Sequence, residues 1–175
     1  VHESGFNFDG NIFNNCPDWV NLVGFFQSEK YFIKVESAVR EDFTFKDEIL
    51  IPCKEMMLGV ECPISLHIRR GDFLINSGNH YNLGLEYYEE ALTHFDNDIP
   101  VIIFSDDPKW CKEQDLFSSD RFLVAEGNSS YVDLCLMSLC KYHIIANSTF
   151  SWWGAWLANS KKVIAPKKWF GPPLD

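Results

Sequence analysis

The chain has 175 residues, of which 46% are hydrophobic and 15% are aromatic. This is enough apolar material for one well-packed domain and argues against disorder. The formal net charge of −10 disfavours generic binding to nucleic acids or anionic membranes, since both need a basic surface. No apolar run approaches the roughly 18 residues that span a bilayer. Val1-His2-Glu3-Ser4 has no basic segment followed by an apolar stretch, so no signal peptide is expected.

The six cysteines have no zinc-site spacing, because none form a C-x-x-C pair and no histidine pair completes the pattern. We therefore expect a reduced, cytosolic chain. Asn128-Ser129-Ser130 and Asn147-Ser148-Thr149 fit the glycosylation sequon, a short and common pattern that we treat as incidental.

Residues 1–62 show no regular alternation of elements and are expected to form a separate segment. Trp19–Phe26 could form a strand, a helical stretch is expected from Ser28 to about Phe43, and Phe45–Leu58 predicts a further helix, broken or offset by Pro52. We expect this strand and helical segment to pack on, or bridge from, a core domain of residues 63–175.

From Pro63 onward, short apolar runs alternate with segments whose apolar residues recur at helical spacing. The expected strands are Pro63–Ile68, Val101–Phe104, Phe122–Ala125, Tyr142–Ala146 and Lys162–Ala165. The expected helices are Leu85–Phe95, Pro108–Leu116, Ser130–Tyr142 and Ser151–Asn159. This order is typical of βαβ units and predicts a Rossmann-like, doubly wound α/β fold with a mostly parallel sheet. Ligands in such folds bind beyond the carboxyl ends of the strands, near a topological switch point.

Two adjacent arginines follow the first expected strand, in His67-Ile68-Arg69-Arg70-Gly71-Asp72. Consecutive side chains of an extended segment point to opposite sides, so the arginines are expected to do different things. One could bind a phosphate in bidentate fashion while the other pairs with a structural carboxylate. The alternative is a surface arginine pair with an aspartate in a turn.

The turn Asn147-Ser148-Thr149-Phe150-Ser151 opens a helix after the fourth expected strand. Its backbone N–H groups and the helix dipole could bind an anion, although ordinary N-capping would also explain the hydroxyls. The tryptophans of Trp152-Trp153-Gly154-Ala155-Trp156 are expected in the core. Asp133 either complements a helix dipole or faces the cleft, where its carboxylate could accept two N–H bonds from a guanine edge.

Other acidic and basic residues have simpler explanations. Asp96-Asn97-Asp98 matches the Asp-x-Asp pattern of metal-dependent sugar transferases, but Asp and Asn are ordinary turn residues before Pro100. Asp106-Asp107 most simply caps the next helix, and a ribose contact stays open. His80 lies in a loop after the arginine pair, where a histidine is usually solvated.

Four segments resemble, in order and spacing, the bacterial α-1,2-fucosyltransferases of glycosyltransferase family eleven. They are His67 through Asp72 (HIRRGD), Phe104 through Asp107 (FSDD), Asp133 through Cys140, and Ile145 through Leu157 (IANSTFSWWGAWL). Asn21 through Ser28 (NLVGFFQS) is similar as well, so the resemblance covers nearly the whole chain.

The resemblance implies a two-domain, GT-B-like enzyme that transfers fucose from GDP-fucose to the 2-hydroxyl of a galactoside, with inversion and without a metal or other cofactor. Arg69 would bind the β-phosphate and Arg70 would brace its loop. The His67 backbone and Asp133 would recognise guanine, Asp106 would contact the donor, and Asn147, Ser148, Thr149, Phe150 and Ser151 would form the pyrophosphate turn. Arg69 would also stabilise the leaving GDP. Asp72 and His80 are candidates for the base that takes the proton of the acceptor hydroxyl.

Two departures from the family pattern suggest the donor-binding part of a longer protein. No Gly-Gly-Leu-Gly-Asn-Gln-like motif is present, and Asn79 through Gly84 follows the usual His-Gly-containing tract only in part. The alternatives are a GDP-sugar-binding fragment without activity of its own, or a fucosyltransferase of another linkage. The expected partners are GDP-fucose and a galactoside glycan, not nucleic acid. A lipid-linked acceptor would place the cytoplasmic protein at the inner face of the membrane.

Overall fold

A computed structural model describes residues 1–171, and the chain divides into two compact units after Thr44. Helix α3 (Asp47–Met56) belongs to the second unit, where it packs against helix α7 (Ser130–Leu139), with Cys53 in the same buried cluster as Cys135. The division expected after residue 62, with the preceding segment packing on or bridging from the core, stays a prediction. Helix α3 also continues through Pro52 without the expected break, at the cost of the hydrogen bond that a proline cannot donate.

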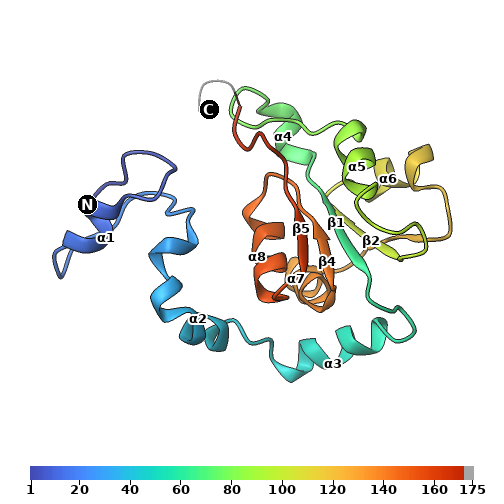
Figure 1. The fold of residues 1–175 in the computed structure, drawn as a ribbon, viewed down its shortest axis with the longest axis horizontal. Helices are drawn as coiled ribbons and strands as arrows, with labels where there is room; N and C mark the ends of the chain where they lie inside the picture. The colour runs from blue at the N-terminus through green and yellow to red at the C-terminus, as the bar shows by residue number, and fades with distance from the viewer. Residues whose placement is uncertain (172–175) are drawn as a thin grey trace. The chain divides into compact units, whose positions relative to one another are not determined.

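The described part of the second unit contains one sheet of five parallel strands in the order β3-β2-β1-β4-β5 (Figure 1). The strands are β1 (Ile64–Ile68), β2 (Val101–Ser105), β3 (Phe122–Val124), β4 (Tyr142–Ile144) and β5 (Lys162–Ile164). Leu66 of β1 pairs with Ile103 on one side and with Ile144 on the other. The predicted Rossmann-like fold is confirmed, and the strand order reverses between β1 and β4, which is the topological switch point.

Alternate side chains of the strands pack into two buried layers, one on each face of the sheet. On one face, Ile64, Leu66 and Ile68 pack with helix α5 (Leu85–Leu92) and with residues of helix α6 (Pro108–Lys112) and the 3-10 turn η3 (Asp115–Phe117). On the other face, Ile102 and Phe104 pack with α3, with α7 and with Phe150 of helix α8 (Thr149–Leu157). Helices on both faces explain why β1 is buried along its whole length and β2 along most of it, with the Ser65 and His67 side chains buried among the apolar ones.

The first unit, residues 1–44, contains helix α1 (Gly10–Asn15), the 3-10 turns η1 (Glu29–Tyr31) and η2 (Ile33–Val35), and helix α2 (Glu36–Asp42). The helical stretch expected from Ser28 to Phe43 is therefore present in interrupted form. The strand expected at Trp19–Phe26 is not, and only Val23 makes an isolated bridge, with His2. Trp19 and Phe26 have positive φ angles, and the Glu3 carboxylate accepts the N–H groups of Phe25 and Phe26 that a strand partner would need.

In the described residues, the helices are all too short or too polar to cross a membrane.

Candidate functional site

Arg69 and Arg70 lie between the carboxyl end of β1 and the short helix α4 (Gly71–Ile75), and their side chains have different partners. Nη2 of Arg69 lies 2.7 Å from Oδ1 of Asp72, and Nη1 lies 3.2 Å from Oδ2 of Asp106. Nε of Arg70 donates to Asp107 over 3.2 Å, and its guanidinium carbon lies 3.8 Å from the centre of the Trp110 ring. Arg70 is thus held between a carboxylate and an aromatic face, whereas the Arg69 side chain is 35% exposed.

Asp106 ties the end of β2 to the arginine loop. Its Oδ1 accepts the backbone N–H of Arg70 over 2.9 Å, while Oδ2 pairs with Arg69. A Cβ at Gly71 would lie 2.6 Å from Oδ2, so a larger residue at this position would displace the Asp106 carboxylate. Of the Asp106-Asp107 pair, which was expected to cap α6, only Asp107 does so. Its side chain accepts the N–H of Trp110 over 3.1 Å.

His67 connects β1 to the start of α8. Its side chain is buried, and its ring centre lies 5.7 Å from that of Phe150. Burial, and secondly the charge of Arg69, lower the pKa of His67 to about 3, so the ring is neutral at physiological pH. In the described part of the chain, Nδ1 has no hydrogen-bond partner.

The turn before α8 uses some of its polar groups to stabilise the fold and leaves others at the carboxyl edge of the sheet. The Ser151 hydroxyl lies 3.2 Å from the Ser148 carbonyl oxygen and is buried, so it stabilises the turn. Ser148 is the N-cap residue and its side chain caps no N–H. The N–H groups of Thr149, Phe150 and Ser151 lie in the first turn, where a helix offers no internal acceptor. This end of α8 therefore offers backbone donors and the Thr149 hydroxyl to an anion.

Asn147 is buried and joins two loops at the same edge of the sheet. Its Nδ2 donates to the carbonyl oxygens of Tyr81 and Trp169 over 2.9 and 2.8 Å. The N–H of Gly171 donates to Asn79 over 2.9 Å, so the loops are also joined directly. Figure 1 shows the last described residues beside α4.

His80 lies in the first of these loops and stacks on Phe73 of α4. The ring centres are 4.0 Å apart and the planes differ by 7°. The Arg69 guanidinium carbon lies 5.7 Å from the centre of the same Phe73 ring. Phe73 thus links Arg69 to His80, a role that sequence reasoning missed, although its position four residues after Arg69 is the spacing of neighbours on a helix. The contact between Trp110 and Arg70 could not be predicted from spacing, because the two residues are forty positions apart.

Asp133 lies in the amino-terminal half of α7 and accepts a hydrogen bond from Nδ2 of Asn128 over 2.9 Å. Burial raises the pKa of the Asp133 carboxyl, and the Asn128 hydrogen bond partly offsets the rise. Asp133 bonds to Asn128 rather than to either arginine. The structure therefore brings Arg69, Arg70, Asp72 and Asp106 into direct contact, and pairs the Asp133 carboxylate with Asn128 instead.

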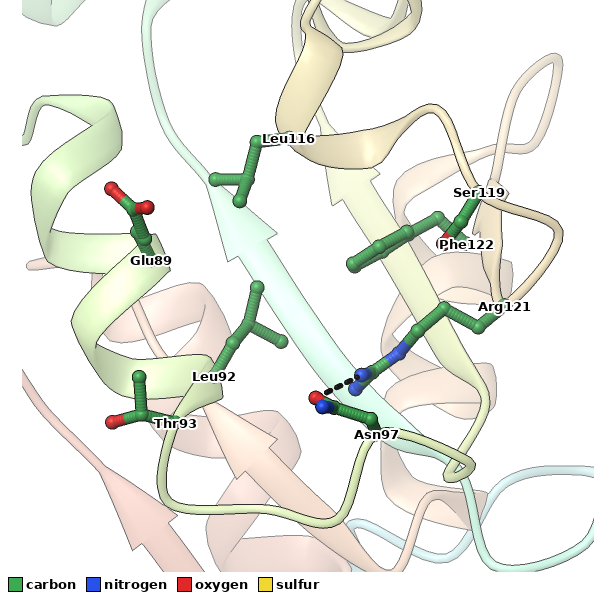
Figure 2. Close-up of a pocket in the computed structure, with 8 residues that line it drawn as sticks. All are labelled: Glu89, Leu92, Thr93, Asn97, Leu116, Ser119, Arg121 and Phe122. Carbon is green, nitrogen blue, oxygen red and sulfur yellow. Dashed lines mark hydrogen bonds between the residues drawn. The ribbon is translucent and has the colours of Figure 1, made fainter.

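The Asp96-Asn97-Asp98 turn precedes β2 and so lies at the edge opposite the arginines. Oδ1 of Asn97 accepts a hydrogen bond from Arg121 over 3.1 Å, at the wall of a cavity of about 400 Å³ between α5 and the η3–β3 segment (Figure 2). A second cavity, of about 450 Å³, lies between α3 and α7. Neither cavity is lined by Arg69 or by the turn before α8. In the described residues, no three His, Cys, Asp or Glu side chains gather as metal ligands would.

Known proteins with similar sequences include an Escherichia coli α-1,2-colitosyltransferase, 42% identical over 164 residues, which cover 86% of this chain and 56% of the relative. The E. coli O-antigen biosynthesis glycosyltransferase WbnK is 35% identical, with 90% of this chain and 59% of that protein covered. The chain thus spans less than two thirds of the length of these relatives.

Solved structures with the same fold include the fucosyltransferase NodZ from Bradyrhizobium, with a TM-score of 0.57 at 15% identity, covering 90% of this chain and 58% of that chain. POFUT1 in complex with GDP gives a TM-score of 0.59 at 12% identity, covering 83% of this chain and 54% of that chain. These likenesses support a GT-B-like fold. Residues 11–173 match the family described as Glycosyl transferase family 11. Together with the 42% identical relative, this match shows that the chain belongs to glycosyl transferase family 11.

Proposed function

We propose that this chain binds GDP-fucose and forms the donor-binding part of an inverting galactoside α-1,2-fucosyltransferase. The observation that carries the proposal is the position of Arg69, at the switch point between β1 and β4 and on the same edge as the first turn of α8. A cationic side chain and backbone N–H groups are suitable partners for a diphosphate. In a chain of net charge −10, a local donor cluster is needed to bind such an anion.

The proposed chemistry follows from how charge develops as the sugar–phosphate bond breaks. Negative charge builds on the GDP oxygens, so Arg69 and the α8 N–H groups stabilise the transition state more than the ground state. The acceptor hydroxyl attacks the opposite face of the sugar, which inverts the linkage. Asp72, whose side chain is 62% exposed, and His80 are the candidate bases for its proton. The chain supplies cations for the leaving group, so we propose that no metal is required.

Colitosyl transfer is the second candidate activity, because a relative at 42% identity carries the name α-1,2-colitosyltransferase. A fucosyltransferase of another linkage, or a fragment that binds GDP-sugars without activity of its own, would use the same donor site. The acceptor is proposed to be a galactoside glycan, and a relative at 35% identity carries the name O-antigen biosynthesis glycosyltransferase. Donor binding is therefore the property to test first.

The test is calorimetric titration of the chain with GDP and GDP-fucose in the presence of EDTA, with UDP and ADP as comparisons. We expect selective binding of the guanine nucleotides without metal. Arg69→Ala should weaken GDP binding by roughly 2–4 kcal/mol, because a charge-assisted contact is lost. Arg40→Ala, which removes a cation from the separate first unit, is the matched control. Near-wild-type affinity of Arg69→Ala would disprove the phosphate role, and binding that needs manganese would disprove the metal-independent site.

A further inference from the structure

The two carboxylates that hold Arg69 differ in how firmly they are themselves held. Asp106 contacts Arg69 through Oδ2, accepts the Arg70 N–H through Oδ1, packs against the Gly71 backbone, and its side chain is 24% exposed. Asp72 reaches Nη2 of Arg69 over 2.7 Å from a side chain that is 62% exposed. Asp106 is therefore built into the loop, whereas Asp72 is held mainly by its ion pair with Arg69.

A diphosphate that approaches Arg69 meets both negative charges at once. Like charges within a few ångströms repel strongly, and a phosphate oxygen seeks the same N–H groups that the carboxylates occupy. Release of Asp106 would leave the Arg70 N–H without its acceptor, whereas Asp72 can turn into water, which solvates its carboxylate. An exposed ion pair of this kind is also weak. The group that gives way is thus Asp72.

We propose that Asp72 is a displaceable counter-ion, which holds the Arg69 guanidinium in place before the donor arrives and is exchanged for the β-phosphate of a nucleoside diphosphate. This inference rests on the proposed donor site and adds a role to it. Asp72 is a positioning residue for donor binding, and its charge sets the affinity for the diphosphate. Because its carboxylate leaves Arg69 only when the donor is bound, the same exchange produces an unpaired carboxylate beside the sugar.

The experiment compares GDP and GMP binding to the wild-type chain and to Asp72→Asn by calorimetry. Asp72→Asn removes the competing charge and keeps the size of the side chain, so GDP should bind about two- to tenfold more tightly. GMP lacks the β-phosphate, so its affinity should be unchanged. Asp115→Asn, at an exposed position of the 3-10 turn η3 on the opposite edge, removes the same charge and should change neither affinity. Asp106→Ala should weaken GDP binding, because it removes the acceptor of the Arg70 N–H and so loosens the loop.

The outcomes separate this inference from the donor site itself. If the folded wild-type chain and Asp72→Asn both fail to bind GDP, the proposed function of the chain is wrong. If the wild type binds GDP and Asp72→Asn binds it equally or more weakly, the donor site stands and the displaceable counter-ion is wrong. Equal tightening for GDP and GMP, or tightening by Asp115→Asn as well, would likewise overturn the exchange at the β-phosphate, since it would reflect net charge alone.

Discussion

Asn147 shows how a polar residue at the edge of the proposed site serves the fold. The sequence suggested that it belonged to an anion-binding turn, yet its amide nitrogen donates to Tyr81 and Trp169, which are 66 and 22 positions away along the chain. The side chain is 4% exposed, so both hydrogen bonds form in a dry environment where an unmade bond is costly. Asn147 therefore holds together the two loops that border the arginines.

Asn147→Asp should destabilise the chain by about 1–3 kcal/mol, because a carboxylate cannot donate to either carbonyl oxygen and is itself buried. Urea unfolding followed by circular dichroism measures the change in the free energy of unfolding. Asn82→Asp, at an exposed position of the same loop, is the control and should shift stability by less than about 0.5 kcal/mol. Equal stabilities of the two variants would show that Asn147 does not hold the loops.

Among the elements, the strands could be predicted because burial on both faces leaves a strong sequence signal. Ile64–Ile68 and Val101–Ser105 differ from the expected strands by one residue at one end, and the helices between them confirm the βαβ pattern. Trp19–Phe26 has the same apolar character, but the N–H groups of Phe25 and Phe26 bind the Glu3 carboxylate, from a residue more than twenty positions earlier. An apolar run alone does not show whether a strand partner exists.

The site could be predicted only as far as contacts are local in sequence. Arg69 and Asp72 are three residues apart, so their pairing lies within the reach of a motif. Asp106 and Trp110 approach the arginines because β2 lies beside β1 in parallel register. That contact depends on the order of strands in the sheet, which the alternation of elements does not specify.

The packing of α7 against α8 gives a prediction at this scale. A Cβ at Gly154 would lie 2.9 Å from Cβ and 3.0 Å from Sδ of Met137, which is fully buried. Alanine normally stabilises a helix interior relative to glycine by roughly 0.5–1 kcal/mol, but overpacking costs about 1–3 kcal/mol. We expect Gly154→Ala to lower the free energy of unfolding by about 1–2 kcal/mol in thermal or urea melts. Gly78→Ala, where a Cβ meets nothing within 4 Å, is the control and should not lower the free energy of unfolding. Equal free energies of unfolding for the two variants would refute close packing of α7 against α8.

At the scale of the whole molecule, the acidic surface and the proposed anion site oppose each other. A net charge of −10 repels a nucleoside diphosphate at long range, while Arg69 and the first turn of α8 attract it within a few ångströms. Salt screens the long-range repulsion more than the contact. Attraction of the donor therefore depends on short-range contacts at the site. Arg69 and Arg70 can have carboxylate partners before the ligand arrives, because they do not have to attract the donor from a distance.

Stability as a whole should depend on two neutral, buried histidines. Nε2 of His143 lies 2.9 Å from the carbonyl oxygen of Met137, so this nitrogen carries the proton, and Nδ1 lies 2.9 Å from the Ser160 hydroxyl. Burial lowers the pKa of His143 to about 4, with a partial offset from the Met137 hydrogen bond. The pKa of His67 is lowered as well, to about 3. Burial therefore favours the uncharged form of both rings in the folded chain.

A histidine whose pKa is lower in the folded than in the unfolded chain stabilises the fold fully above the unfolded pKa of 6.5, and this contribution is lost as the pH falls toward the folded pKa. Below pH 6.5 the unfolded chain therefore binds more protons than the folded chain at His143. The free energy of unfolding should fall by up to about 1.4 kcal/mol per pH unit, and by about 3 kcal/mol in total between pH 6.5 and 4. Carboxylates that titrate in the same range add their own slope, so the wild-type curve alone does not isolate the histidine.

His143→Gln separates the contribution of His143 from that of the carboxylates, because the glutamine amide can donate to Met137 but does not titrate. Urea unfolding of both proteins at intervals between pH 7.5 and 4.5 should give curves that converge as the pH falls, since the variant has no histidine to protonate on unfolding. His94→Gln, at an exposed position after α5, should leave the wild-type slope intact. If the wild type and His143→Gln instead remain separated by a constant free energy across the range, His143 takes up no extra proton on unfolding, and the acid sensitivity of the fold would have to lie in its carboxylates.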